Sequence, residues 1–353
     1  MTIGIVGSLV LLLGVLGAPT LASSADGGTT VAEEGPCAGI GAPMSEQRVA
    51  NSDGSVTHVY GSGIDQVVVT DPPEGFDPLT ATDRELEAYN FPARPPATAD
   101  EEEQRDWVED VTAERGPAQP PCVTTSYAAH IDAYKWSGFL VDAGAKKFEG
   151  VKAKVKLAAL GNWNVPGCQA ASLVSWVGLG GQNSASLIQA GIGYLYGSPG
   201  TPVAWYEWVD ATHTIPITTF PNSISLHKND QVKITVTRSS TGWTTFSVNN
   251  LTRGVSSVYA RSLPASYWDG STAEWIDERT TSGTTITQLL PFKPIDWSAA
   301  KMQTTDGTWH TLQSGAQHQV WMQGGSTAPV LLAKPDNGLT SSTAFTDYFH
   351  KCS

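Results

Sequence analysis

The sequence predicts an all-β protein, a sandwich of two antiparallel sheets preceded by an acidic, proline-rich N-terminal region. Charged residues make up only 16% of the 353 residues, and glycine, with 35 residues, is frequent. This composition is typical of turn-rich sheet proteins. Short stretches of alternating apolar and polar residues recur from residue 127 onward, and no long segment has apolar residues at helical spacing with caps at its ends.

Each predicted strand rests on this alternation. "VKAKVKL" (151–157) places apolar residues at every second position with lysines between them, and "QVKITVTR" (231–238) has the same pattern. Further short strands are predicted in "TFSVNNLTRG", "TTITQLL" and "HQVWMQGG". A body of about 230 residues is larger than an immunoglobulin-type sandwich of ~100 residues. Its size fits a jelly-roll or lectin-like (concanavalin A-like) sandwich better.

The N-terminus has the pattern of a secretory signal peptide over residues 1–25. An apolar run from Ile3 to about Leu16 is followed by small residues at cleavage spacing, although no Lys or Arg precedes it. The alternative is an uncleaved anchor, but the run is shorter than the ~20 residues that span a bilayer. We therefore expect a secreted, extracellular protein without a membrane segment after cleavage.

Residues 26–121 form a second predicted region, distinct from the body at 122–353. Residues 26–122 hold 20 Asp and Glu against 5 Arg and no Lys, whereas the rest of the chain has a balance of +2. The region predicts one helix at about 101–113, and a hairpin formed by "SVTHVYG" and "IDQVVVT".

Two interpretations of the acidic region stay open. It is either a solvated, partly disordered leader or a propeptide that covers the mildly basic body as an intramolecular inhibitor. A cover of this kind would loosen in acid, because its carboxylates protonate as the pH falls.

Four cysteines fit an exported protein, and they allow two disulfides in three connectivities. We predict the pairs Cys37–Cys122 and Cys168–Cys352, because each disulfide would then crosslink residues within one region. A monomer is the default expectation for such a secreted protein.

Motifs for several kinds of chemistry are missing from the sequence. It contains no G-x-S-x-G, H-E-x-x-H, P-loop or C-x-x-C pattern, and its seven histidines are scattered. Basic residues do not alternate with aromatic ones, which disfavours nucleic-acid binding. We expect neither a metal nor a cofactor.

Three stretches instead combine a polar residue in a predicted strand with aromatic or aliphatic neighbours. They are "SWVGLGGQNSASLIQAGIGY", "VAWYEWVD" and "TAEWIDER", with Gln189, Glu207 and Glu274 as the polar residues. For any one stretch, a packing tryptophan and a water-facing polar residue would be the ordinary explanation. The same pattern in all three favours a shared open groove.

At these residues the sequence resembles the glutamic peptidases, the eqolisin family (peptidase family G1), and in particular bacterial-type secreted members. Five motifs occur in the family's order and spacing: Trp136-Ser137-Gly138, "WVGLGG" at 176–181, "LIQAG" at 187–191, "WYEW" at 205–208 and "AEWI" at 273–276. The leader segment "ATDRELEAYNFPARPP" also resembles the N-terminal region of bacterial members.

The resemblance implies a secreted, acid-favouring endopeptidase, which acts on polypeptides with a catalytic pair formed by Gln189 and Glu274. It further implies a cleft lined by Trp136, Trp176, Trp205 and Glu207. The pair makes chemical sense: a carboxylate can take and return a proton of water, and an amide can donate to an oxyanion.

Two positions depart from the pattern of fungal members, which usually carry aspartates there. They are Gly180 and Gly193. Two effects then compete: fewer like charges would lower the pKa of Glu274, and fewer hydrogen-bond partners would leave its side chain less well fixed. We therefore expect a pH optimum different from the fungal one but still below neutral.

Two other functions remain open from the residues. Glu207 and Glu274 would be the carboxylate pair of a glycoside hydrolase if they lie at a suitable separation. A tryptophan-rich sandwich would also suit a non-catalytic carbohydrate-binding domain.

Overall fold

The computed structural model describes residues 37, 41–63, 66–99, 101–123, 126–127, 134–162, 164, 168–182, 184–198, 200–325, 329–336 and 338–352. The predicted signal peptide lies outside these residues. No helix within them is long and apolar enough to cross a membrane.

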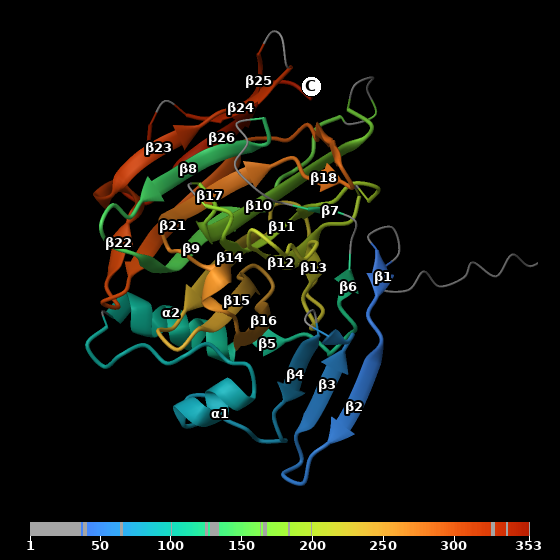
Figure 1. Cartoon of the computed structure of the whole chain (residues 1–353), viewed down its shortest axis with the longest axis vertical. Helices are drawn as coiled ribbons and strands as arrows, with labels where there is room; N and C mark the ends of the chain where they lie inside the picture. Colours follow the sequence, from blue (N-terminus) through green and yellow to red (C-terminus); the bar gives the residue numbers. More distant parts are fainter. Residues whose placement is uncertain are drawn as a thin grey trace, which may run out of the picture. The chain divides into compact units, whose positions relative to one another are not determined.

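Two large sheets form the body (Figure 1), and the described residues contribute ten strands to each. The first sheet has the order β1-β6-β13-β12-β11-β10-β17-β8-β23, with β20 beside β10. Its strands are β1 (Ala42–Pro43), β6 (Cys122–Val123), β13 (Thr218–Thr219), β12 (Val203–Val209), β11 (Leu187–Tyr194), β10 (Ala171–Gly180), β17 (Thr272–Glu278), β8 (Trp136–Asp142), β23 (Ala316–Val320) and β20 (Gln288–Leu289).

The second sheet has the order β24-β25-β26-β21-β9-β14-β15-β16-β5, with β22 beside β21. Its strands are β24 (Met322–Gly324), β25 (Val330–Pro335), β26 (Phe345–Phe349), β21 (Ile295–Thr304), β9 (Phe148–Lys156), β14 (Gln231–Arg238), β15 (Trp243–Asn250), β16 (Val255–Ser262), β5 (Glu114–Arg115) and β22 (Trp309–Thr311).

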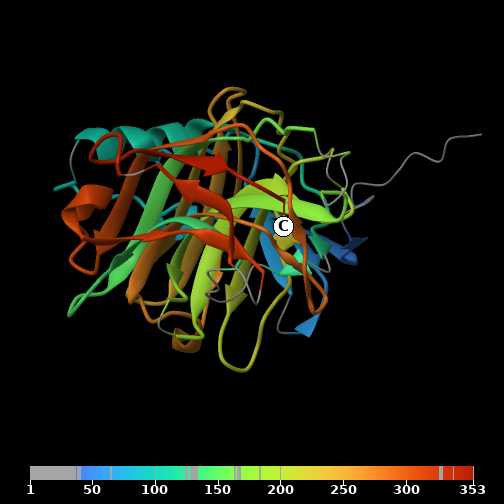
Figure 2. The same ribbon diagram turned by 90° about the horizontal axis from the view of Figure 1, so that it is seen from above.

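The two sheets pack face to face, which confirms the predicted sandwich (Figures 1 and 2). The alternation in β9 explains the packing. Val151, Ala153 and Val155 are buried in the core between the sheets. The lysines between them lie on the other face, because successive strand residues point to opposite sides.

Smaller elements complete the fold. The described residues include two three-stranded sheets, two α-helices and two 3₁₀ helices. The small-sheet strands are β2 (Glu46–Ala50), β3 (Val56–Tyr60), β4 (Val67–Asp71), β7 (Ser126–Tyr127), β18 (Thr281–Ser282) and β19 (Thr285–Ile286). The helices are α1 (Asp83–Ala88), α2 (Glu101–Thr112), η2 (Ala265–Tyr267) and η3 (Leu312–Ser314).

The acidic N-terminal region contains strands and helices in the residues that the structure describes. The predicted hairpin is present as β3 and β4, and α2 ends one residue before the predicted helix. Helix α1 was not predicted, although Thr82 and Glu85 form its capping box. A small core of Leu86, Phe91, Trp107 and Val111 joins both helices.

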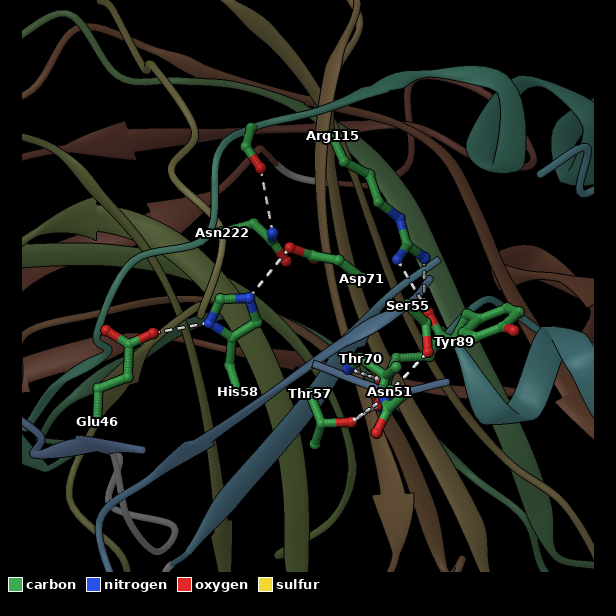
Figure 3. Close-up of polar contacts among 12 residues, drawn as sticks. Glu46, Asn51, Ser55, Thr57, His58, Thr70, Asp71, Tyr89, Arg115 and Asn222 are labelled. Carbon is green, nitrogen blue, oxygen red and sulfur yellow. Dashed lines mark hydrogen bonds and ion pairs between the residues drawn. The ribbon is translucent and has the colours of Figure 1, made fainter. Parts of the chain in front are cut away.

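Polar contacts fix the sheet of this region (Figure 3). His58 lies between two carboxylates, with Nδ1 at 2.7 Å from Glu46 and Nε2 at 3.2 Å from Asp71. Arg115 donates to the carbonyl oxygens of Tyr89 and Asn90, each at 3.0 Å. These bonds tie the region to β5, which pairs in parallel with β16 of the second sheet.

Helix α2 packs on the outer face of the second sheet through ion pairs. Asp106 lies 2.9 Å from Lys152, and Asp110 lies 2.8 Å from Lys233. Glu102 adds a third pair with Lys301 at 2.9 Å. The acidic region therefore does sit on a basic surface of the body.

Both predicted disulfides are present. Cys37 is bonded to Cys122, and Cys168 is bonded to Cys352.

Candidate active site

The register of three neighbouring strands brings Gln189 and Glu274 together. Gly178 of β10 pairs with Gln189 of β11 on one side and with Glu274 of β17 on the other. Paired residues of antiparallel strands share a face, and neighbouring strands are about 4.8 Å apart. The two Cα atoms are thus about 10 Å apart, and the Trp176 ring and a methyl group of Leu187 lie over Gly178 between them.

This face of the first sheet points away from the second sheet. Trp275, which follows Glu274, is fully buried and donates from Nε1 to the carbonyl oxygen of Lys152 in β9, at 3.0 Å. Glu274 must point the opposite way because side chains alternate along a strand. The alternation noted in the sequence therefore places Glu274 outside the core between the sheets.

The tryptophans predicted for the cleft gather on the same face as Gln189 and Glu274. Trp136 and Trp176 meet edge to face, with ring centroids 5.0 Å apart. A Cβ atom at Gly191 would lie 2.7 Å from Cζ2 of Trp205 and 2.7 Å from Cβ of Trp176, so only glycine leaves room for both side chains here. These rings form one buried apolar cluster with Val174, Leu187, Leu195, Val203, Val209, Ile217 and Ile276.

Glu207 holds the amide of Gln189. The two residues pair between β12 and β11, and Gln189 Nε2 donates to Glu207 Oε2 at 2.5 Å. Because two strands separate Glu207 from Glu274, their Cα atoms are about 14 Å apart. Glu207 therefore contacts the amide of the pair, and the register gives no support to a glycosidase pair of carboxylates.

Glu274 lies in an environment that favours its neutral form. Burial raises its pKa well above the usual range, a hydrogen bond from Thr272 Oγ1 at 2.9 Å opposes this, and the charge of Asp269 raises the pKa further. The other carboxyl oxygen, Oε2, faces Gly181, where a Cβ atom would lie only 3.6 Å away.

The loss of negative charge expected at Gly180 is offset by a residue that the sequence analysis did not single out. A Cβ atom at Gly180 would lie 3.1 Å from Asp269 Oδ1, so this carboxylate occupies the space beside the glycine. Negative charge is therefore present beside Gly180 although an aspartate is missing there, and it contributes to the raised pKa of Glu274.

Both departing glycines are required by the backbone. The φ angles of Gly180 and Gly193 are +91° and +151°, in the region that favours glycine. A Cβ atom would lie 2.3 Å from the carbonyl oxygen of Ser186 or Leu173, respectively. Neither position of this chain can hold an aspartate in its present conformation.

The expectation of an open groove is wrong for this chain. Gln189, Glu207 and Glu274 have 0% exposed surface, and so do Trp136, Trp176 and Trp205. The site lies on an outer face of the sandwich but is closed to solvent.

The described residues contain no group of three or more His, Cys, Asp and Glu side chains that could hold a metal ion. Besides Asp269, two further residues of this site were not predicted, Gly178 and Glu278. Glu278 follows Glu274 by four positions, so the same alternation would have placed it on this face.

A β-sandwich whose outer face pairs an amide with a buried carboxyl among tryptophans fits a glutamic peptidase. The Peptidase A4 family matches residues 134–340, well over half of the chain. The chain belongs to this family, and it is a hydrolase that acts as a glutamic endopeptidase.

Solved structures of glutamic peptidases are similar to this chain. A scytalido-glutamic peptidase with a transition-state analogue has a TM-score of 0.48 and 21% identity, covering 62% of this chain and 98% of its own. SCP-B, an eqolisin in complex with the tripeptide Ala-Ile-His, has a TM-score of 0.46 and 21% identity, with the same coverage. Aspergilloglutamic peptidase from Aspergillus niger has a TM-score of 0.41 and 22% identity, covering 51% and 99%. No curated protein matches the chain.

Proposed function

We propose that the protein is a secreted endopeptidase in which Glu274 and Gln189 act together on a water molecule and a peptide bond. The observation that carries this proposal is the register, which places both residues opposite Gly178 on one face. The amide and the carboxyl then lie on the two strands that flank Gly178, and the Trp176 ring packs over the glycine between them.

In the proposed reaction, the carboxylate of Glu274 takes a proton from water as the oxygen attacks the carbonyl carbon. The side-chain amide of Gln189 donates a hydrogen bond to the oxyanion that forms. Glu274 then returns the proton to the nitrogen as the carbon–nitrogen bond breaks, and the products are a carboxylic acid and an amine. Glu207 orients the amide of Gln189 through the bond that it accepts.

The buried state of the pair supports a precursor form. A polypeptide cannot reach groups with no exposed surface. Burial is also the largest influence that raises the pKa of Glu274, and it therefore disfavours the carboxylate that the reaction requires. Opening of the site would expose the pair and lower this pKa, so activity and access would appear together.

We propose that the acidic N-terminal region maintains the closed state as an intramolecular inhibitor. Helix α2 does not plug the site, because it packs on the outer face of the second sheet, whereas the pair lies on the outer face of the first. Its ion pairs would instead keep the region attached until acid or cleavage releases it.

The test uses the full chain, incubated between pH 2 and 8 and then mixed with an unfolded protein substrate. We expect intact mass to show shortening in acid, and product release to follow this shortening. Glu274→Gln and Gln189→Ala should both abolish cleavage while the thermal unfolding midpoint stays close to that of the parent.

Gln313→Ala is a matched control, because Gln313 is exposed in the 3₁₀ helix η3, outside the strands that carry the pair. It should leave activity unchanged. Full activity in either site variant would overturn the proposed pair, and full activity of the unshortened chain would overturn the inhibitor role.

A further inference from the structure

Glu278 is a second buried carboxyl on the face that carries the proposed pair. It lies on β17 four residues after Glu274, and it pairs with Val174 of β10 and Trp136 of β8. Its exposed surface is 0%. The proposed reaction gives it no role, although burying a carboxyl is costly unless it makes specific contacts.

The contacts of Glu278 are specific. Trp176 donates from Nε1 to Glu278 Oε2 at 2.9 Å. The ammonium of Lys135 lies 3.6 Å from Glu278 Oε1, and only 7% of its side chain is exposed. Burial raises the pKa of Glu278 to about 7, while Lys135 and the bond from Trp176 oppose this.

The opposite end of the same indole lies beside the proposed pair. A Cβ atom at Gly178 would lie 2.8 Å from Trp176 Cζ3 and 3.2 Å from Cε3. The six-membered ring of Trp176 therefore occupies the space over Gly178, between the strands of Gln189 and Glu274. One rigid side chain connects Glu278 with this space.

We propose that Glu278 is a positioning residue for peptide cleavage, which fixes the Trp176 indole over Gly178 and so sets the floor between Gln189 and Glu274. The inference rests on the proposed function of that pair. An indole has two side-chain torsions, and the bond at Nε1 fixes the ring within its plane. The edge-to-face contact with Trp136 restrains it from the side.

Rotation of this ring would change the gap into which water and the peptide carbonyl must fit. Misplacement of reacting groups by about 1 Å can cost on the order of 100-fold in rate. Removal of the acceptor should therefore lower kcat more than it raises KM, because bound substrate remains held by the rest of the cleft.

The test compares three variants of the full chain after acid incubation. Glu278→Gln keeps an acceptor oxygen and the side-chain volume. Glu278→Leu keeps the volume but lacks the acceptor, and it is made in a Lys135→Met background so that no ammonium is left buried without its partner. Lys135→Met alone is the matched reference.

At pH 4 we expect Glu278→Gln to retain kcat within about twofold, because the native carboxyl is neutral at this pH. Near pH 7 the difference should widen, because the native carboxyl ionises beside the Lys135 ammonium and a glutamine does not. Glu274 is the other titratable group on this face, and its environment favours the neutral form. The leucine variant should lose kcat by about 10- to 100-fold against its reference, with little change in KM.

Unchanged kcat in the leucine variant overturns the proposal, and so does an equal loss in the glutamine variant at pH 4. If the leucine variant does not fold, Glu278→Ser replaces it, because serine is too short to reach the indole and admits water around Lys135. Glu274→Gln in the same assay distinguishes the positioning role of Glu278 from the proposed catalytic pair. Retained activity in Glu274→Gln would reject the pair, independently of the result for Glu278.

Discussion

Gln189 and Glu274 are separated by one strand, and that strand carries a glycine at the position between them. The two side chains are therefore not neighbours along a ladder. They face each other across Gly178, and the ring of Trp176 and a methyl group of Leu187 border the gap. The gap is a property of three strands in register, and no single motif contains it.

The first prediction concerns this gap. Gly178→Ala places a methyl group 2.8 Å from the Trp176 ring, so the indole must move. We expect activity to fall by at least about 100-fold, with a loss of about 1–3 kcal/mol in unfolding free energy from overpacking. Steady-state kinetics and urea unfolding measure both. Gly200→Ala is the matched control, because a Cβ atom there meets no atom within 4 Å; similar losses in both variants would contradict this explanation.

The second prediction concerns the charge beside Gly180. Asp269→Asn removes a like charge from the surroundings of Glu274, so the pKa of Glu274 should fall. The acid limb of the kcat/KM profile should then shift to lower pH, because the base becomes available at lower pH. Asp296→Asn, which removes an exposed charge on β21, should leave the limb in place. A shift to higher pH in Asp269→Asn would reject the electrostatic role.

The third prediction concerns stability against pH. Asp277 and Asp347 lie in the core, where Ser137 Oγ donates to Asp347 at 2.8 Å and Trp297 Nε1 donates to Asp277 at 3.0 Å. Burial raises the pKa of Asp277 to about 6, and burial together with the charge of Asp277 raises that of Asp347 further.

A pKa that is higher in the folded state than in the unfolded state favours folding at low pH. This stabilisation is therefore present below about pH 4 and is lost as the pH rises through about 6, by about 3 kcal/mol for Asp277 alone. Urea unfolding at pH 4 and 7 measures the loss. Asp347→Asn should flatten this dependence, and an unchanged slope would show that the two carboxyls do not interact.

The fourth prediction concerns helix α2. Burial raises the pKa of Asp106, but the charges of Lys152 and Lys233 outweigh it, so the net pKa is lowered and acid weakens the contact. Asp110 has the opposite sign, because burial raises its pKa despite Lys233. The protection of the amides of residues 101–112 against hydrogen exchange, taken relative to the intrinsic exchange rate at each pH, should fall as the pH drops below about 4.

In Asp106→Asn, exchange of the helix should already be faster near pH 6. The free energy that keeps helix α2 attached should fall by an amount between the ~1 kcal/mol of an exposed ion pair and the ~3–5 kcal/mol of a buried one. Asp110→Asn is the control, and it should still lose helix protection below about pH 4. If Asp110→Asn abolishes this acid sensitivity and Asp106→Asn does not, the sensitivity belongs to Asp110.

Much of this architecture could be predicted from alternation in the sequence. The strands around Lys152 and Lys233, the hairpin and both disulfides follow from local pattern and compartment. Gln189 and Glu274 stood out because each interrupts an apolar strand. Strand order was not predictable, since it depends on contacts between distant segments. The roles of Gly178 and Asp269 were hidden for the same reason.

Closure of the site was also beyond the sequence. Alternation places Glu274 on an outer face, but it does not say whether another part of the chain covers that face. The carboxylate beside Gly180 could not be predicted for a similar reason. Asp269 lies almost 90 positions away in the chain and reaches the glycine only in the folded protein.

The bridge between Cys37 and Cys122 spans 85 positions of the acidic region. A protease that nicks the chain anywhere inside this span releases nothing, since sulfur still joins the two pieces. Detachment requires a cut C-terminal to Cys122, and the discarded piece then leaves as one covalently closed ring. Maturation would thus be visible on a non-reducing gel as a single step, and internal nicks would appear only after a reductant is added.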